Sequence, residues 1–425
     1  MTPDARPAGI RAVLTSPAYR RLWAARTVSQ CGDVAQFTTT ALLVLQLTGS
    51  GLGVSGLVLA EIAPVLILAP LAGSLVDRLP RVAVMVSADV VRALLAATLV
   101  VWHDNVAIVY AVGFGLSAGS TFFNPAASSL LPSLVEEREL VAANSGIWSA
   151  AVLSQVLIAP AAGFLATTTG FGWAFALNAV SFAVSGLALR GLRGGEAPRP
   201  VVTGGTWTHG LEALRLLGRD RLLRALALGQ ALAALSAGAT SALLVVLAAR
   251  RLQTQGGGYG LMLAAIGIGA FLGPLLLARS SARLLRPRVV FGAFAVRGLV
   301  DVVLATVTAL PAALGALVCY GLGTSAGNVT FSSLIQSHVP AQLRGRVFSA
   351  FDLIWQSMRL ASLLLGGLLA DTLGIRAVFY TGGILLLAAA ATGLAANGQV
   401  PHGPRGGGGS EDLNGPRGGG STTMT

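Results

Sequence analysis

The sequence predicts an all-α membrane protein, with twelve transmembrane helices arranged as two pseudo-symmetric six-helix bundles. Of its 425 residues, 54% are hydrophobic and only 11% are charged, which is too little polar surface for a soluble domain of this length. Apolar runs long enough for a helix to cross a bilayer, about 20 residues, recur along nearly the whole chain. These runs are too long and too uniformly apolar to be the strands of a barrel.

The predicted spans fall into two sets of six. Residues 20–190 are expected to form the first bundle and residues 221–396 the second, joined by a polar linker at 191–220 that is rich in Gly, Pro and Arg. Residues 1–19 are expected to be an N-terminal arm, and the Gly-rich composition of residues 397–425 is typical of a disordered tail. The expected spans are 20–47, 52–75, 82–102, 106–131, 139–167, 171–190, 221–249, 257–279, 287–309, 312–336, 343–371 and 375–396.

The two halves share a residue pattern at an offset of 204 positions, which predicts a duplicated six-helix unit. Asn124 corresponds to Asn328 and Gly170 to Gly374, and several Ser positions keep the same register without a gap. An apolar bias aligns Leu and Ala by chance, but it does not align amides and turn glycines. Parallel repeats of this kind relate the two halves of some transporters.

The charge distribution predicts the orientation in the membrane. The net charge is +12 and all 29 basic residues are Arg. With the spans above, 22 Arg fall in one set of alternating loops and tails, three fall in the other set, and four lie inside spans. An excess of basic loops on one side marks the cytoplasmic side. We therefore expect both termini in the cytoplasm of a bacterial plasma membrane, and we expect the basic charge to serve topology and not nucleic-acid binding.

A short charged loop separates the second and third spans, at Gly73-Ser-Leu-Val-Asp77-Arg78-Leu-Pro80-Arg81. The pattern Gly-x-Leu-x-Asp-Arg-x-x-Arg resembles the loop between helices 2 and 3 of the major facilitator superfamily of transporters. The resemblance implies the major facilitator fold, and it implies that Gly73, Asp77, Arg78 and Arg81 form a latch between the two halves on the cytoplasmic side. The alternative is an ordinary basic cytoplasmic turn.

Two further stretches resemble the macrolide-efflux and enterobactin-exporter branch of that superfamily. They are the opening of the first span up to Asp33 and the run Leu343-Arg-Gly-Arg-Val-Phe-Ser349. A third stretch, Ala159-Pro160-Ala-Ala-Gly163 in the fifth span, resembles the Gly-Pro-x-x-Gly motif of helix 5 in drug:proton antiporters of the superfamily, with Ala159 in place of the first Gly. Pro160 bends a helix, and Gly163 allows a neighbouring helix to pack closely.

Two carboxylates inside spans are candidates for proton coupling. Asp33 falls near the middle of the first span and Glu61 in the outer half of the second. Ionisable groups at this depth are costly, and they usually face a cavity or a partner. The alternative for Asp33 is a static ion pair with Arg26, and the alternative for Glu61 is a structural carboxylate.

Other polar residues inside spans are candidates for the wall of a substrate cavity. Helical spacing places Arg26, Gln30, Asp33 and Phe37 on one face of the first span, and Asp352, Gln356 and Arg359 on one face of the eleventh. An intrahelical pair with Asp352 is the alternative for Arg359, and interhelical hydrogen bonding is the alternative for the matching amides. The candidates are Arg26, Gln30, Phe37, Asn124, Gln155, Asn328, Asp352, Gln356 and Arg359.

Taken together, the residues and the resemblance predict a secondary active transporter that exports a small amphipathic organic molecule by alternating access. The proton gradient is the expected energy source, with no cofactor, and the chain is expected to act as a monomer in the lipid bilayer. Proton-driven uptake of a nutrient and a non-transporting scaffold or sensor on the same fold remain alternatives. We expect no enzyme and no metal site, because no metal-ligand or nucleophile pattern surrounds the four His.

Overall fold

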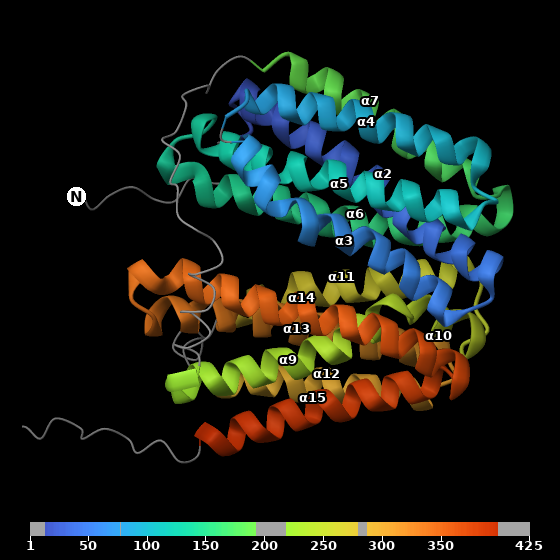
Figure 1. Cartoon of the computed structure of the whole chain (residues 1–425), viewed down its shortest axis with the longest axis vertical. Coiled ribbons are helices and arrows are strands. Elements are labelled where there is room, and N and C mark those ends of the chain that lie inside the picture. Colours follow the sequence, from blue (N-terminus) through green and yellow to red (C-terminus); the bar gives the residue numbers. More distant parts are fainter. Residues whose placement is uncertain (1–12, 77, 193–217, 279–286, 398–425) are drawn as a thin grey trace, which may run out of the picture.

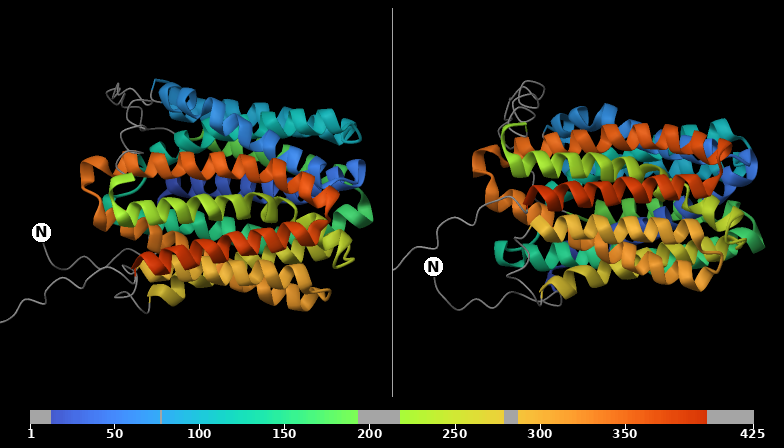
Figure 2. Two further views of the ribbon diagram at one scale, coloured as in Figure 1. Left: turned by 60° about the horizontal axis from the view of Figure 1, so that its bottom comes forward. Right: turned by 90° about the horizontal axis from the view of Figure 1, so that it is seen from below.

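The computed structural model describes residues 13–76, 78–192, 218–278 and 287–397, and all the regular structure in these ranges is helical. Asp77, most of the predicted linker and the Gly-rich tail lie outside the described residues. The helices run side by side in two stacked bundles, with α2–α7 in one and α9–α15 in the other (Figures 1 and 2). Each bundle is built from one half of the chain.

The helices agree closely with the predicted spans. The first half contains α2 (Pro17–Thr48), α3 (Gly51–Val76), α4 (Arg81–Trp102), α5 (Val106–Leu130), α6 (Leu140–Thr169) and α7 (Gly172–Arg190). The second half contains α9 (Arg221–Ala242), α10 (Leu244–Arg250), α11 (Gly256–Ala278), α12 (Pro287–Thr306), α13 (Leu310–His338), α14 (Ala341–Thr372) and α15 (Ile375–Asn397).

Two details differ from the prediction. The single span expected at 221–249 is divided into α9 and α10, because the backbone at Leu243 leaves the helical range (φ −90°, ψ 10°). The first helix begins at Pro17, so the last residues of the predicted N-terminal arm belong to it. Ser16 caps this start by accepting a hydrogen bond from the backbone N–H of Tyr19, as expected for Ser before a Pro at the first helical position.

Eleven helices in the described ranges are long and apolar enough to cross a membrane. α2 is not among them, because it carries Arg20, Arg21, Arg26 and Asp33 together with several Gln and Thr residues. It nevertheless packs along its length against α6 and α7 inside the first bundle (Figure 1). A polar helix in this position is expected where the helix faces an aqueous cavity and not lipid.

The backbone confirms the predicted duplication. Four described residues have a positive φ, and they form two pairs at the predicted offset of 204 positions. Gly170 (φ 91°) pairs with Gly374 (φ 86°), and Gly49 (φ 58°) pairs with Gln253 (φ 49°). The same turns therefore recur at the same places in both halves, although one of the four positions does not carry Gly.

The two halves are joined at one end of the molecule and separated at the other. We call the end where α2 begins and α15 ends the termini end, and the opposite end the far end (Figure 1). At the far end, one hydrophobic cluster contains buried residues of both halves, such as Leu57 and Val109 with Leu244 and Tyr259. At the termini end, each half has a separate cluster of its own.

Candidate functional site

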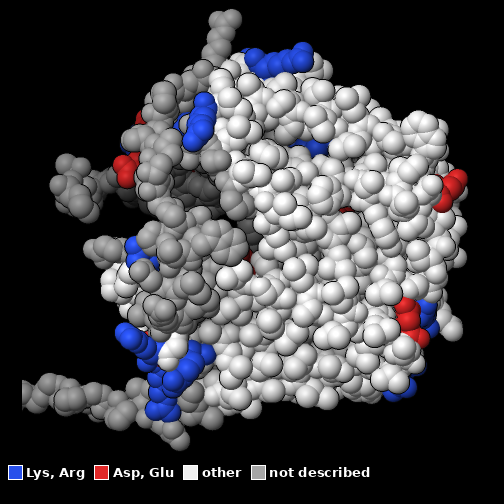
Figure 3. Space-filling model, in the orientation of Figure 1, with Lys and Arg blue, Asp and Glu red and all other residues white. Residues whose placement is uncertain are grey.

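A cavity of about 590 Å³ lies between the two halves. Eight of the ten helices that line it are the equivalents of predicted spans 1, 2, 4, 5, 7, 8, 10 and 11, as expected for the fold, while α10 completes the seventh span and α7 adds Asn178. The surface is hollowed between the bundles on the side of the termini end (Figure 3). Its polar lining residues are Asp33, Gln36, Glu61, Ser117, Ser120, Gln155, Asn178, Ser241, Tyr320, Gln356 and Arg359.

Asp33 lies halfway along α2 and is positioned by α7. The side-chain amide of Asn178 donates a hydrogen bond to Oε1 of Gln36 at 2.7 Å, and it also interacts with the Asp33 carboxylate. Asn178 in turn accepts a hydrogen bond from Ser181 at 3.0 Å. Gly32 makes this geometry possible, because a Cβ at that position would collide with Ser181 and Asn178. Asp33 therefore faces the cavity inside a defined hydrogen-bonding network.

Glu61 lies on the same wall of the cavity, on α3. Tyr110 of α5 donates a hydrogen bond to the carbonyl of Gly53 at 2.6 Å, and Ser117 donates one to the carbonyl of Glu61. These bonds fix α3 against α5 and leave the Glu61 carboxylate directed to the cavity. Asp33 and Glu61 carry charges of the same sign on the same wall, so the two carboxylates repel one another when both are ionised.

The opposite wall carries a positive charge. Arg359 and Gln356 lie one turn apart on α14, in the second half, and both line the cavity. Arg359 lies near enough to Glu61 for their charges to attract, but the two groups form no ion pair in the part of the chain that the structure describes. Oε1 of Gln356 is buried without a hydrogen-bond partner among the described residues.

Six of the eleven predicted coupling and cavity residues line this cavity: Asp33, Glu61, Phe37, Gln155, Gln356 and Arg359. For the other five, a place in the substrate path stays a prediction. They occupy helices that reach the cavity, but they lie closer to the termini end than the residues that line it. They are Arg26, Gln30, Asn124, Asn328 and Asp352.

The alternative ion pairs are also absent from the described residues. Arg26 forms no ion pair with Asp33, and Asp352, which is exposed, forms none with Arg359. Both pairings within one helix, allowed by the sequence, are therefore wrong for this conformation. Asp33 and Arg359 instead face a shared cavity from different halves.

The guanidinium of Arg92, buried near the wall that the first half contributes, is held by contacts within that half. Arg92 of α4 forms an ion pair with Asp89 and lies between the rings of Phe123 and Phe182, at 4.5 and 4.3 Å. It also donates a hydrogen bond to Ser120, which lines the cavity, at 3.3 Å. The i, i+3 spacing of Asp89 and Arg92 in the sequence allows this pair, but it gives no sign of the connection to the cavity through Ser120.

The equivalent pair in the second half is arranged differently. Arg297 donates a hydrogen bond to the hydroxyl of Tyr320 at 3.0 Å, and Asp301 accepts one from Ser236 at 3.1 Å. Although Arg297 and Asp301 lie at i, i+4 on α12, they share no hydrogen bond or ion pair in the described part of the chain. Tyr320 brings Arg297 into contact with the cavity wall, as Ser120 does for Arg92.

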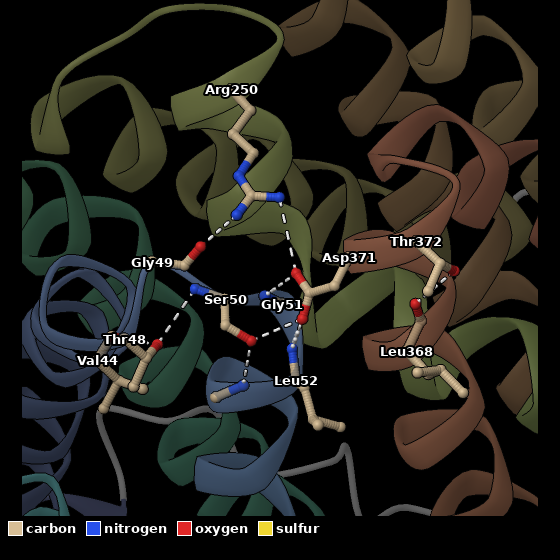
Figure 4. Close-up of polar contacts among 11 residues, drawn as sticks. Val44, Thr48, Gly49, Ser50, Gly51, Leu52, Arg250, Leu368, Asp371 and Thr372 are labelled. Atoms are coloured by element: carbon tan, nitrogen blue, oxygen red, sulfur yellow. Dashed lines mark hydrogen bonds and ion pairs between the residues drawn. The ribbon is translucent and has the colours of Figure 1, made fainter.

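The far end is closed by a carboxylate that crosses from one half to the other. Asp371, at the end of α14, accepts hydrogen bonds from the Ser50 hydroxyl at 2.6 Å and from the backbone N–H groups of Gly51 at 2.7 Å and Leu52 at 3.0 Å (Figure 4). Arg250 lies 3.7 Å from the same carboxylate and donates a hydrogen bond to a carbonyl of the first half. We call these five residues the far-end cap.

The helix-5 motif lies at a second contact between the halves. α6 and α11 pack backbone to backbone, and a Cβ added at Gly163, Gly256 or Gly260 would collide with the main chain of the other helix. The expectation that Gly163 lets a neighbour pack closely is thus confirmed. The predicted cytoplasmic latch remains a prediction, because Asp77 lies outside the described residues. Of the other latch residues, Gly73 lies within α3 and Arg78 is exposed.

Two six-helix bundles around a central cavity define the fold of a secondary transporter. The chain belongs to the major facilitator family described as "Transmembrane secretion effector", which matches residues 8–404. It is 30% identical over 357 residues to the multidrug efflux pump Tap of Mycolicibacterium fortuitum, covering 79% of this chain and 85% of that pump. It is 28% identical to Tap of Mycobacterium tuberculosis (H37Rv), covering 89% and 92%.

A solved structure supports the fold. A bacterial homologue of the iron transporter ferroportin, in its inward-facing state, superimposes with a TM-score of 0.71 at 20% identity. The match covers 89% of this chain and 98% of that one. The protein is therefore a multi-span membrane transporter of the major facilitator type.

Proposed function

We propose that the protein exports a small amphipathic organic molecule across the bacterial cell membrane in exchange for protons. The observation that carries the proposal is the pair of carboxylates, Asp33 and Glu61, on one wall of a cavity between two separable halves. The likeness to multidrug efflux pumps of two mycobacterial species supports the direction of transport.

The distribution of Arg supports the orientation. The described ends of helices at the termini end carry Arg20, Arg21, Arg78 and Arg190, among others, whereas the far end carries few. By the positive-inside rule the termini end faces the cytoplasm. The cavity, hollowed toward the termini end, is then positioned to receive substrate from the cytoplasm (Figure 3).

The proposed cycle links protonation to the direction in which the cavity faces. A mostly apolar wall of Val, Leu and Ile side chains holds the apolar part of the substrate, and the polar groups orient it. After the halves rock to open the far end, protons from outside neutralise Asp33 or Glu61 and favour release of the substrate. A ligand or a proton drives such a change only through its different affinity for the two states.

Everted membrane vesicles that are acidified inside provide the test. Addition of an exported compound should release protons from the vesicles, which is measured with a fluorescent pH probe. Asp33→Asn is expected to abolish this response while retaining exchange of labelled substrate in the absence of a gradient. Asp104→Asn, which alters an exposed acid at the far end, is the matched control and should respond like the wild type.

Three results would overturn the proposal. Gradient-driven uphill export by the Asp33→Asn, Glu61→Gln double variant would exclude both carboxylates as proton carriers. A pH response of the opposite sign would indicate uptake. No response of the wild type across cationic, neutral and zwitterionic compounds would favour a scaffold or sensor on the same fold.

A further inference from the structure

The cavity presents opposite charges from opposite halves. Asp33 on α2 and Glu61 on α3 belong to the first half, whereas Arg359 on α14 belongs to the second. Arg359 carries the formal positive charge in the cavity lining, because the other charged residues in the lining are the two acids. The electrostatic field therefore changes sign across the cavity, from one half to the other.

These groups do not satisfy one another. Glu61 and Arg359 interact through their charges, but the structure shows no salt bridge or hydrogen bond between them in the described ranges. Oε1 of Gln356, one turn from Arg359, is a buried acceptor without a partner among the described residues. A buried polar atom that lacks a partner is costly, so a ligand that donates to Oε1 of Gln356 gains free energy there. The same ligand gains further free energy where it pairs with the charges of Glu61 and Arg359.

Ligands of a single charge fit this arrangement poorly. A cation is attracted by Glu61 and repelled by Arg359 across the same cavity, and an anion meets the reverse. A neutral apolar compound leaves the polar groups of both walls unpaired. A molecule that carries both charges on one apolar body matches the two walls at once.

We propose that the cavity selects amphipathic zwitterions, whose ammonium group lies toward Glu61, whose anionic group lies toward Arg359, and whose N–H or O–H donor reaches Oε1 of Gln356. The inference rests on the proposed function, since it names the substrate class of that transport site. Such a ligand contacts both halves and therefore links them, whereas a ligand that contacts only one half does not. Arg359 is thereby a specificity-determining residue.

A matched pair of probes separates the two charges of the ligand. Norfloxacin is a zwitterion, and its ethyl ester keeps the amine but lacks the carboxylate. Binding of both to the purified full-length protein in detergent is measured by the anisotropy of the fluoroquinolone. The wild type is expected to bind the zwitterion at least about tenfold more tightly, because only the zwitterion can form a charge-assisted hydrogen bond with Arg359.

Variants assign this preference to Arg359. Arg359→Gln should abolish the preference by weakening only the binding of the zwitterion. Arg359→Lys should retain part of the preference, and this would show that the site is intact. Arg138→Gln, at an exposed pair with Glu136, is the control for net charge and should change neither affinity. Equal affinity of the wild type for acid and ester, or an equal loss of both in Arg359→Gln, would overturn the proposal.

The outcome is distinguishable from a failure of the proposed function, because binding is measured without a gradient. A zwitterion preference without proton release from vesicles would retain the ligand class and reject proton-coupled export. Proton-coupled export of the ester in preference to norfloxacin would retain the function and reject the ligand class.

Discussion

The carboxylate of Asp371, in the second half of the chain, accepts a hydrogen bond at 2.7 Å from the backbone N–H of Gly51, the first residue of α3 in the first half. The first N–H groups of an α-helix have no partner within the helix, and they carry partial positive charge. Asp371 satisfies them from across the interface. The end of one half is thus a helix cap for the other, and the far end cannot open without breaking it.

Replacing Asp371 by Ala is expected to favour opening at the far end. Loss of a helix cap costs about 0.5–2 kcal/mol, and a change of about 2 kcal/mol alters an equilibrium roughly 30-fold. Ser55 of α3, buried against Gly367 of α14, is a reporter position. In a background lacking both native cysteines, Ser55→Cys should react much faster with an external, membrane-impermeant maleimide once Asp371 is replaced.

Asp104→Ala is the control for this experiment, because Asp104 is an exposed acid at the same end that pairs with His103 of its own half. It should leave the labelling rate at the wild-type value. If Asp371→Ala labels no faster than Asp104→Ala, the cap does not hold the far end closed.

The α6–α11 contact leads to a second prediction. A Cβ at Gly260 would collide with the backbone of Ala159 and Pro160, which cannot move aside as a flexible side chain does. Gly260→Leu should therefore hold the halves apart at the far end, increase labelling of the Ser55→Cys reporter and reduce export severalfold. Gly292→Leu is the control, since no atom lies within 4 Å of a Cβ at that position. Normal export by Gly260→Leu would contradict this account.

The unusual backbone at Gln253 leads to a third prediction. Its φ of 49° is the counterpart of Gly49, and the left-handed conformation costs a residue with a Cβ about 1–2 kcal/mol. Gly adopts it without that cost but loses more chain entropy on folding. Gln253→Gly should stabilise the protein by about 0.5–1 kcal/mol, seen as a higher Tm in detergent. Gln255→Gly, two residues away without a positive φ, should give no gain, and equal effects would contradict the strain argument.

The residues that sequence reasoning placed correctly are those fixed by helical periodicity. Gln356 and Arg359 share a face of α14 whatever the tertiary structure, so their common presence in the cavity could be predicted. The depth of a residue along its helix could not be predicted, because it depends on where the two halves meet. Asp352, on the same face but nearer the termini end, is consequently not among the residues that line this cavity.

Contacts between the halves were the least predictable. Asp371 and Gly51 are separated by 320 residues, and neither position carries a local signal for pairing. Asn178 was missed for a similar reason, since its role depends on how closely α7 approaches α2 at Gly32. The break between α9 and α10 could not be predicted either, because no Pro or Gly stands at Leu243 to mark it.

The start of α9 leads to a prediction on pH dependence. Asp220 accepts a hydrogen bond from the backbone N–H of Leu223 at 2.9 Å, and Nε2 of His338, at the end of α13, lies 2.9 Å from its carboxylate. Burial raises the pKa of Asp220, but the hydrogen bonds from His338 and Leu223 outweigh it and hold the pKa below its usual value. The ionised carboxylate is therefore favoured in the folded state.

A lowered folded pKa means that Asp220 contributes stability above the ordinary Asp pKa of about 4, and that this contribution is lost as the pH falls through the folded value. Asp220→Asn keeps a good capping residue and removes only the charge. Because the pair is partly exposed, the loss at pH 7 should be less than about 1 kcal/mol. The Tm difference between wild type and variant should shrink toward zero on acidification below pH 4; a difference that stays constant or grows would show that the charge of Asp220 does not stabilise the start of α9.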